Sequence, residues 1–329
     1  MLKNPDLRKQ PLGVQQKNIV VTCNYVAREK GVIKCSYIRE ALKVCPELIL
    51  VNGEDLSDYR KWSQQIFEQL RRSSGNCKVE KLGMDENFVD ISDQVQERMD
   101  EEPDSDQQEG YIFGNPRKSC LGALNVCECH KRLKIASVIA NQMRKALFDK
   151  LGITSSCGIA HNKLLAKLGG AKNKPNKQTT IFHETVCDLM GSLSGLRSIP
   201  GLGSATCQQL QEKGIKSIRD LQHSKVSILS EFVQDAQRLI ELANGVDKSV
   251  VKASGKPLSI GLEDRFKCIS NQSECREKAK WLLSRLAKLV LEDGRKPSTL
   301  KVFIRDYEKD KHDPKRKFAK YSRFVVDFF

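Results

Sequence analysis

The stretch Leu82–Ile91 constrains this chain most, because it places two adjacent carboxylates, Asp85 and Glu86, directly before strand-forming residues. Neighbouring side chains of a strand point to opposite faces, so these acids can converge on one ion only if the backbone turns beside them. Gly83 and Asn87 suit such a turn. An acidic pair at a strand end suits Mg²⁺ or Mn²⁺ held against phosphates. The alternative is a solvated hairpin tip, which is the commoner outcome for an isolated Asp-Glu pair.

The charge of the chain indicates a polyanionic partner. The formal net charge is +15 and the pI is near 9.2, which suits nucleic acid or an anionic membrane. Nucleic acid is favoured, since the sequence has no long apolar segment and no basic amphipathic anchor. We therefore expect no membrane partner. A chain of 329 residues is long enough for about two to four domains.

The twelve cysteines are scattered, and none forms a Cys-x-x-Cys pair. This usage favours free thiols in a reducing compartment. The run Cys127-Glu128-Cys129-His130 resembles half of a zinc site. No second ligand pair stands at a suitable spacing in the sequence, so we predict no zinc there.

Residues 1–56 have the pattern of a small mixed α/β unit. Tyr25 and Arg28 are spaced to share one face of a short helix. Arg28 together with Lys34 suits a triphosphate, and an exposed basic face is the equal alternative. The predicted elements are strands at Gly13–Gln16, Ile19–Thr22 and Leu48–Val51, and helices after Asn24 and around Tyr37–Val44.

The next region begins with an amphipathic helix, Leu56–Leu70, and leads into strands within Lys78–Ile91. Glu97–Glu109 has seven acids in thirteen residues and no apolar period, which predicts an acidic surface loop. A long helix with apolar residues from Leu133 to Leu147 then ends at Gly152, and the strand Ile153–Ala160 follows it.

Asn162 is a predicted helix N-cap, which places Lys163 in the first turn of a helix. The ammonium there adds to the positive helix end, a combination suited to phosphate. Lys167 lies one turn further along the same face. The basic turn Lys174–Lys177 then precedes a short strand, Thr179–Phe182.

Residues 184–244 are predicted to be wholly helical, with Ile199–Gly203 joining two helices. Gly201 and Gly203 lack the third glycine of a dinucleotide-binding loop. They suit a helix-hairpin-helix, in which the backbone approaches a nucleic-acid phosphate closely. Gly214–Ser217 begins a possible second hairpin. An ordinary tight helical corner is the alternative for either one.

Asn244–Lys256 is a predicted linker. The strand Leu258–Phe266, the helix Gln272–Leu291 closed near Gly294, and the strand Thr299–Asp306 follow it. Lys309–Arg323 holds seven basic residues against two Asp, which suits binding to a nucleic-acid backbone or a solvated terminal run.

Taken in order along nearly the whole chain, four stretches resemble the Y-family, the translesion DNA polymerases. They are Gly13–Lys17, Thr22–Tyr25, Leu82–Asp90 and Asn162–Lys167. The resemblance implies an α+β, multidomain, right-hand polymerase fold. It implies fingers at 1–56, a palm at 57–173, a helical thumb with a helix-hairpin-helix at 174–244, a linker at 245–256 and a little finger at 257–329.

The resemblance also implies roles. Asp85 and Glu86 are expected to be catalytic, metal-binding carboxylates for Mg²⁺ or Mn²⁺. Tyr25, Arg28 and Lys163 are expected to contact the triphosphate of an incoming dNTP, and Gln16 and Ile19 to lie above the nascent base pair in a pocket linked to low fidelity. Gly201, Gly203 and Lys167 are the candidate DNA contacts. The implied partners are primer-template DNA, dNTP, and replication and repair proteins that act through other regions, and the implied location is the nucleus.

Two departures from the family pattern stand out. The palm of the family begins with a strand carrying Asp-x-Asp-x-Phe, and no stretch of this sequence matches it. The family's little finger continues beyond the point that Phe329 reaches. These departures predict a chain truncated at both ends, with an incomplete palm and little finger, that binds DNA but extends a primer poorly. The alternative function is a non-catalytic DNA-binding relative, and a helix-hairpin-helix nuclease is a weaker third possibility.

Overall fold

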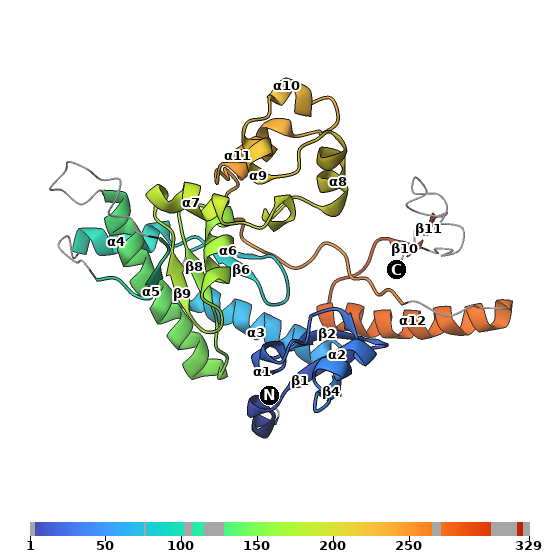
Figure 1. The fold of residues 1–329 in the computed structure, drawn as a ribbon. Helices are drawn as coiled ribbons and strands as arrows, with labels where there is room; N and C mark the ends of the chain where they lie inside the picture. The colour runs from blue at the N-terminus through green and yellow to red at the C-terminus, as the bar shows by residue number, and fades with distance from the viewer. Residues whose placement is uncertain are drawn as a thin grey trace. The chain divides into compact units, whose positions relative to one another are not determined.

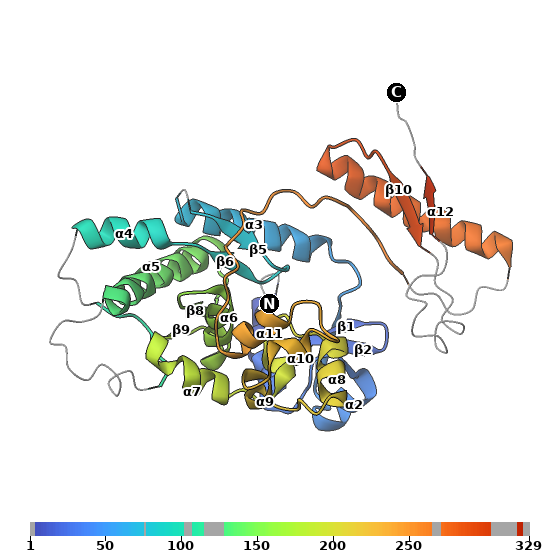
Figure 2. The same cartoon turned by 90° about the horizontal axis from the view of Figure 1, so that it is seen from above.

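The computed structural model describes residues 4–75, 77–101, 107–114, 128–264, 271–303 and 321–324. The chain forms two compact units, Met1–Ser254 and Gly255–Phe329. Figures 1 and 2 show their helices and strands in two views. Among the described helices, none combines the length and the apolar composition needed to cross a membrane.

The N-terminal residues of the first unit form a four-stranded sheet with the order β3-β2-β1-β4, drawn in blue in Figure 1. β1 pairs antiparallel with β2 and parallel with β4. Val20 of the sheet is buried with one alanine from each helix, Ala27 and Ala41. The three predicted strands and two predicted helices of this region are confirmed, with ends within one residue, whereas η1 and β3 were not predicted. The elements are η1 (Pro5–Lys9), β1 (Leu12–Gln16), β2 (Ile19–Cys23), α1 (Tyr25–Glu29), β3 (Ser36–Tyr37), α2 (Ile38–Val44) and β4 (Ile49–Asn52).

Asn24 connects this sheet to α1. Its Oδ1 accepts from the backbone N–H of Ala27, which caps the helix, and also from the backbone N–H of Leu12 in β1. Its Nδ2 donates to the carbonyl oxygen of Gln10. An asparagine at this position therefore begins the helix and fixes its direction against the first strand.

The middle of the first unit contains a three-stranded parallel sheet, β7-β9-β8, and a separate antiparallel hairpin, β5-β6. The long helix α5 packs on β8 and β9, and it runs beside α3 and α4, as Figure 2 shows for α4. The predicted helices and strands are confirmed in type, although β8 is shorter than predicted. The elements are α3 (Ser57–Ser73), β5 (Val79–Lys81), β6 (Asn87–Val89), α4 (Ser92–Glu101), β7 (Tyr111–Ile112), α5 (Glu128–Leu151), β8 (Cys157–Ile159), α6 (Lys163–Lys172) and β9 (Gln178–Thr180).

The helices α5 and α6 pack into two different hydrophobic cores. The two residues after β9 point to opposite sides and contribute one side chain to each core. Ile181 is buried with α6, and the next residue, Phe182, is buried with α5. The helix α6 packs very closely on β8. If any other residue replaced Gly158 of β8, its Cβ would lie 1.8 Å from the carbonyl oxygen of Ala166 in α6. Glycine is therefore required at this strand position.

The predicted acidic loop Glu97–Glu109 is wrong in its first part, because Glu97–Glu101 completes the helix α4. Val95 is buried and Met99 is partly buried in the core built on α5. This apolar pair at i, i+4 stabilises a helix that the count of acids alone argues against. Residues 102–106 lie outside the described part of the chain.

Residues 183–243 of the first unit form short helices joined by turns, which agrees in type with the helical prediction for 184–244, and residues 246–254 form no helix. These helices share one core with Leu164, Leu165 and Leu168 of α6, so this region folds directly onto α6. The elements are η3 (His183–Thr185), α7 (Val186–Gly191), η4 (Leu196–Ser198), α8 (Ser204–Glu212), α9 (Ile218–Gln222), α10 (Val226–Leu229) and α11 (Ala236–Ala243).

The second unit contains α12 (Gln272–Asp293) and the antiparallel strands β10 (Leu300–Phe303) and β11 (Tyr321–Phe324). Gly294 ends α12 with φ +78°, as its predicted role requires. The predicted strand Leu258–Phe266 is wrong where it is described, because residues 258–264 form no strand and the side chain of Leu258 is fully exposed. Positions 265 and 266, and most of the basic run 309–323, lie outside the described residues.

Candidate active site

The turn between β5 and β6 carries Asp85 and Glu86, and both residues are exposed. The backbone N–H groups of Leu82 and Gly83 donate to the carbonyl oxygen of Glu86, at 2.9 Å and 3.2 Å. The predicted turn before the strand is therefore confirmed. The two carboxylates stand at the tip of a short hairpin, where solvent reaches them.

Two lysines of α6 hold this hairpin. Nζ of Lys163 lies 3.0 Å from Oε2 of Glu80, and Nζ of Lys167 lies 2.9 Å from Oε2 of Glu86. The ammonium of Lys163 also lies 5.5 Å from the ring centre of Phe88. It is therefore Lys167, and not Lys163, that pairs with a carboxylate of the predicted acidic pair.

The local sequence explains the position of Lys163. Oδ1 of Asn162 accepts from the backbone N–H of Leu165 at 2.9 Å, so the predicted N-cap is confirmed and Lys163 is the first residue of α6. Glu80 and Phe88 are directly opposed across the hairpin. Their side chains share one face, which is why a single ammonium contacts both.

Glu80 is the residue of this site that the sequence analysis missed. Burial raises the pKa of its carboxyl, but the backbone N–H of Lys252 at 2.8 Å and the ammonium of Lys163 outweigh burial and hold the pKa below its ordinary value. The backbone N–H of Ser254 also donates to the carbonyl oxygen of Val79, at 3.0 Å. The segment 252–254 therefore lies along the edge of β5, a contact that no local pattern predicts.

The predicted nucleotide residues of the N-terminal sheet come together in two pairs. The guanidinium carbon of Arg28 lies 4.7 Å from the ring centre of Tyr25, and Nε of Arg28 donates to the carbonyl oxygen of Cys23 at 3.1 Å. Gln16 and Ile19 are opposed across β1 and β2. Nε2 of Gln16 donates to the carbonyl oxygen of Gly53 at 2.7 Å.

The two pairs, Tyr25 with Arg28 and Gln16 with Ile19, make their polar contacts separately from the acidic turn. Within the described part of the chain, no hydrogen bond or ion pair joins either pair to Asp85 or Glu86. A triphosphate or a metal would have to link them, as the family resemblance implies.

The predicted helix-hairpin-helix has its glycines on the surface. Gly201 adopts φ +98°, which favours glycine. Gly203 is the N-cap of α8, and Cβ of a residue replacing it would meet no atom within 4 Å. Leu202 between them is buried and holds the turn. At the second predicted hairpin, Ser217 caps α9 through a reciprocal capping box with Asp220.

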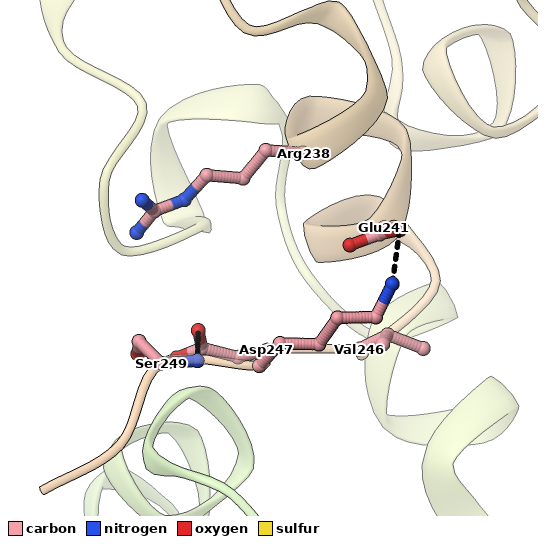
Figure 3. Close-up of a pocket in the computed structure, with 6 residues that line it drawn as sticks. Arg238, Glu241, Val246, Asp247 and Ser249 are labelled. Atoms are coloured by element: carbon pink, nitrogen blue, oxygen red, sulfur yellow. Dashed lines mark hydrogen bonds and ion pairs between the residues drawn. The ribbon is translucent and has the colours of Figure 1, made fainter.

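A pocket of about 290 Å³ lies where the chain leaves α11. Figure 3 shows the side chain of Arg238 extending from its helix, and a dashed line at Glu241 marks the ion pair of this residue with Lys248, which is 2.7 Å long. None of the predicted site residues lines this pocket, whose lining is Arg238, Glu241, Val246, Asp247, Lys248 and Ser249. The candidate active site is therefore the open acidic turn and not this pocket.

Comparison with known proteins identifies the family. A family model described as the impB/mucB/samB family matches residues 1–171, more than half of the chain. The chain belongs to this family. The Y-family resemblance predicted from the four sequence stretches is confirmed, and the α+β architecture agrees with it.

Three relatives show how far this family match extends. The chain is 44% identical to a protein named DNA polymerase iota from Mus musculus over 315 residues, and 43% identical to its Homo sapiens counterpart over 319 residues. Each match covers 95% of this chain but only 43% and 42% of those proteins, so the chain spans less than half of their length. A protein named DNA polymerase IV from Shewanella baltica is 31% identical over 289 residues, which cover 86% of this chain and 70% of that protein.

Proposed function

We propose that this protein carries out low-fidelity, template-directed DNA synthesis past lesions, by transferring dNMP from a dNTP to a primer 3′-hydroxyl. The subdomains would be fingers at 1–56, palm at 57–173, thumb at 174–244, a linker at 245–256 and a little finger from 257. Family membership and similarity to proteins named DNA polymerase iota support this proposal. The nucleus, the DNA and dNTP partners, and contacts with replication and repair proteins are parts of the same proposal.

One observation carries the proposal. The hairpin that carries the acidic turn is held against the N-terminal half of α6 by two ion pairs, Lys163 with Glu80 and Lys167 with Glu86. Acidic and basic side chains therefore lie together on one small surface. A triphosphate with bound cations needs both kinds of group within reach.

The carboxylates of Asp85 and Glu86 fit a hard divalent cation, because they are exposed oxygen ligands on adjacent residues. Mg²⁺ or Mn²⁺ bound there would supply charge neutralisation for the attacking and leaving oxygens. The ammonium of Lys167 lies on the carboxylate of Glu86. This ion pair keeps the turn in place and reduces the repulsion between the two neighbouring acids.

Lys163, Tyr25 and Arg28 would bind the triphosphate. Lys163 is held by Glu80 in the free protein, so an arriving phosphate competes with that carboxylate for the ammonium. The guanidinium of Arg28 is oriented by the carbonyl of Cys23 and the ring of Tyr25. A cation held in place before binding loses little entropy when the phosphate arrives.

DNA binding would rest on the thumb and on the net positive charge. Gly201 and Gly203 are exposed, and a Cβ at Gly203 would meet no atom within 4 Å, which lets a phosphate approach the backbone N–H groups at the start of α8. Lys167 remains a candidate DNA contact, although it pairs with Glu86 in the free protein.

The test is single-nucleotide primer extension with Mg²⁺ and with Mn²⁺, together with primer-template affinity measured by fluorescence anisotropy. Asp85→Ala should remove extension while leaving DNA affinity within about twofold, because it removes a metal ligand and no DNA contact. Asp149→Ala, which removes an exposed acid from the last turn of α5, is the matched control and should extend like the unchanged chain. Measurable extension that is equal for Asp85→Ala and Asp149→Ala would refute the assignment.

The second candidate is DNA binding without catalysis. It is favoured by one observation: within the described residues, no third His, Cys, Asp or Glu ligand gathers with Asp85 and Glu86 within 4.8 Å. The same assay separates the two candidates. Tight binding with no extension under either metal, by the unchanged chain and both variants, would support this second function.

A further inference from the structure

A cluster of nitrogen and sulfur ligands lies away from the acidic turn. Cys129 and His130 are in the first turn of α5, and His183 begins η3, directly after Phe182. One ligand atom from each of the three lies within 4.8 Å of the others. From this geometry we infer a binding site for a zinc-class divalent cation, with Cys129, His130 and His183 as its protein ligands.

The fold supplies what the sequence lacks. The run that includes Cys129 and His130 has no second ligand pair at zinc-site spacing. Because α5 packs on β9, the residues that follow β9 are brought to the first turn of α5. His183 becomes the missing ligand through tertiary packing and not through a motif.

The ring of His130 is held in one orientation. Its centre lies 4.6 Å from the ring centre of Phe182 in an edge-on arrangement, and the side chain is only 14% exposed. Phe182 itself is buried in the core built on α5. A ligand fixed by packing in this way binds a metal with little loss of side-chain freedom.

Glu184 adds a carboxylate behind the two histidines. Its Oε1 lies 2.5 Å from Nε2 of His130 and 3.4 Å from Nδ1 of His183, and its side chain is 5% exposed. Histidines that bind zinc commonly donate their other N–H to a carboxylate, which fixes the tautomer and the ring. Glu184 is placed to do this for both rings.

Charge balance also favours a divalent cation at this place. A buried carboxylate is costly unless a positive charge compensates it. A cation of charge +2 with the Cys129 thiolate and the Glu184 carboxylate gives a neutral group, with both histidines in their neutral form.

The ligand set selects the metal. Two imidazoles and one thiolate suit Zn²⁺, whereas Mg²⁺ and Mn²⁺ prefer the oxygen ligands of the acidic turn. Tetrahedral ligands at zinc bond lengths lie about 3.5 Å apart, so the three atoms, which lie within 4.8 Å of one another, need to approach by roughly 1.3 Å at most. His183 is 67% exposed, which allows it to move and lets a metal and a water ligand enter.

The cation would have a structural role, because it joins the first turn of α5 to the segment that follows β9. This inference stands on different residues and a different metal from the proposed polymerase reaction. It can therefore fail or succeed independently of that reaction.

The experiment uses the tag-free chain, stripped of metal by a chelator and then titrated with Co²⁺ in excess Mg²⁺. We expect one Co²⁺ per chain, with the absorption of tetrahedral cobalt and a thiolate-to-cobalt charge-transfer band. Zn²⁺ should displace it and raise the thermal unfolding midpoint. Absence of a tetrahedral cobalt spectrum would overturn the inference.

Variants locate the site on the chain. His183→Ala should weaken Co²⁺ binding at least about tenfold, and Cys129→Ser should remove the charge-transfer band. The matched controls are His223→Ala and Cys187→Ser, which change an exposed histidine and an exposed cysteine elsewhere and should bind Co²⁺ like the unchanged chain. Because the side chain of His183 is exposed, its variant should keep the circular dichroism of the unchanged chain. Equal binding by His183→Ala and His223→Ala would overturn the assignment.

Discussion

Lys163 donates to both carboxylate oxygens of Glu80, at 3.2 Å and 3.0 Å, although 83 residues separate the two in sequence. The side chains are 15% and 19% exposed, so the pair is more than a surface contact. Lys163, which we propose binds the triphosphate, is therefore already paired with the carboxylate of Glu80 in the free protein. Nucleotide binding would begin with the exchange of this partner for a phosphate.

The first prediction concerns this exchange. Glu80→Gln should tighten dNTP binding to the complex with primer-template DNA by about three- to tenfold, because the competing negative charge is removed. A glutamine oxygen still accepts from the backbone N–H of Lys252, which keeps the edge of β5 in place. The measurement is calorimetric titration with a non-hydrolysable dNTP. Glu97→Gln, an exposed acid of α4, is the control, and weaker binding by Glu80→Gln would show that Glu80 helps to hold the nucleotide.

The second prediction concerns Lys163 itself. Lys163→Ala should weaken dNTP binding roughly ten- to a hundredfold, because a charge-assisted hydrogen bond to phosphate contributes about 1.5–3 kcal/mol. DNA affinity should remain within about twofold. The same titration measures the first effect and anisotropy the second, with Lys145→Ala on the exposed face of α5 as the control. If only DNA affinity fell, Lys163 would be a backbone contact and not a nucleotide ligand.

The parts of this fold that were predictable from sequence are those with local causes. Asn24, Asn162 and Asn271 each cap a helix through their own side chains, and a cap followed by an apolar period indicates a helix start without any tertiary information. The turn at Asp85 and Glu86 was predictable for a similar reason. Its residues and the strand that follows are contiguous.

The parts that were missed depend on contacts between distant residues. Glu80 belongs to the site because Lys163 of α6 and the backbone N–H of Lys252 both donate hydrogen bonds to its carboxylate. The residues next to Glu80 in the sequence give no indication of either contact. The helix α4 continues through acids because Val95 and Met99 pack on α5. Leu258 was predicted to begin a strand, but no strand pairs with it in the described part of its unit.

The third prediction concerns the thumb turn. Gly203→Leu should lower duplex DNA affinity several-fold and to a similar degree for all sequences, because phosphate contacts carry no base information. The fold should tolerate the change, since Gly203 has φ −78° and a Cβ there meets no atom within 4 Å. Gly191→Leu, at another open position at the end of α7, is the control. A loss confined to some sequences, measured by anisotropy on unrelated duplexes, would indicate base readout instead.

The last prediction concerns pH. Although burial raises the pKa of Glu80, its hydrogen bonds with the Lys252 backbone and with Lys163 outweigh that effect and bring the pKa below the ordinary value of 4.5. The folded state therefore binds the proton less readily than the unfolded state. The stabilisation is fully present above about pH 4.5 and is lost as the pH falls through the lower pKa of the folded protein.

Other carboxylates also titrate in this range, so the prediction is a difference between two proteins. The free energy of unfolding of the unchanged chain, minus that of Glu80→Gln, should be largest near neutral pH and should shrink as the pH falls below 4.5. Urea unfolding at a series of pH values measures it, and Glu97→Gln should show a small difference that hardly varies with pH. A difference for Glu80→Gln that grows on acidification would mean that the folded state raises the pKa of Glu80, because burial outweighs its two partners.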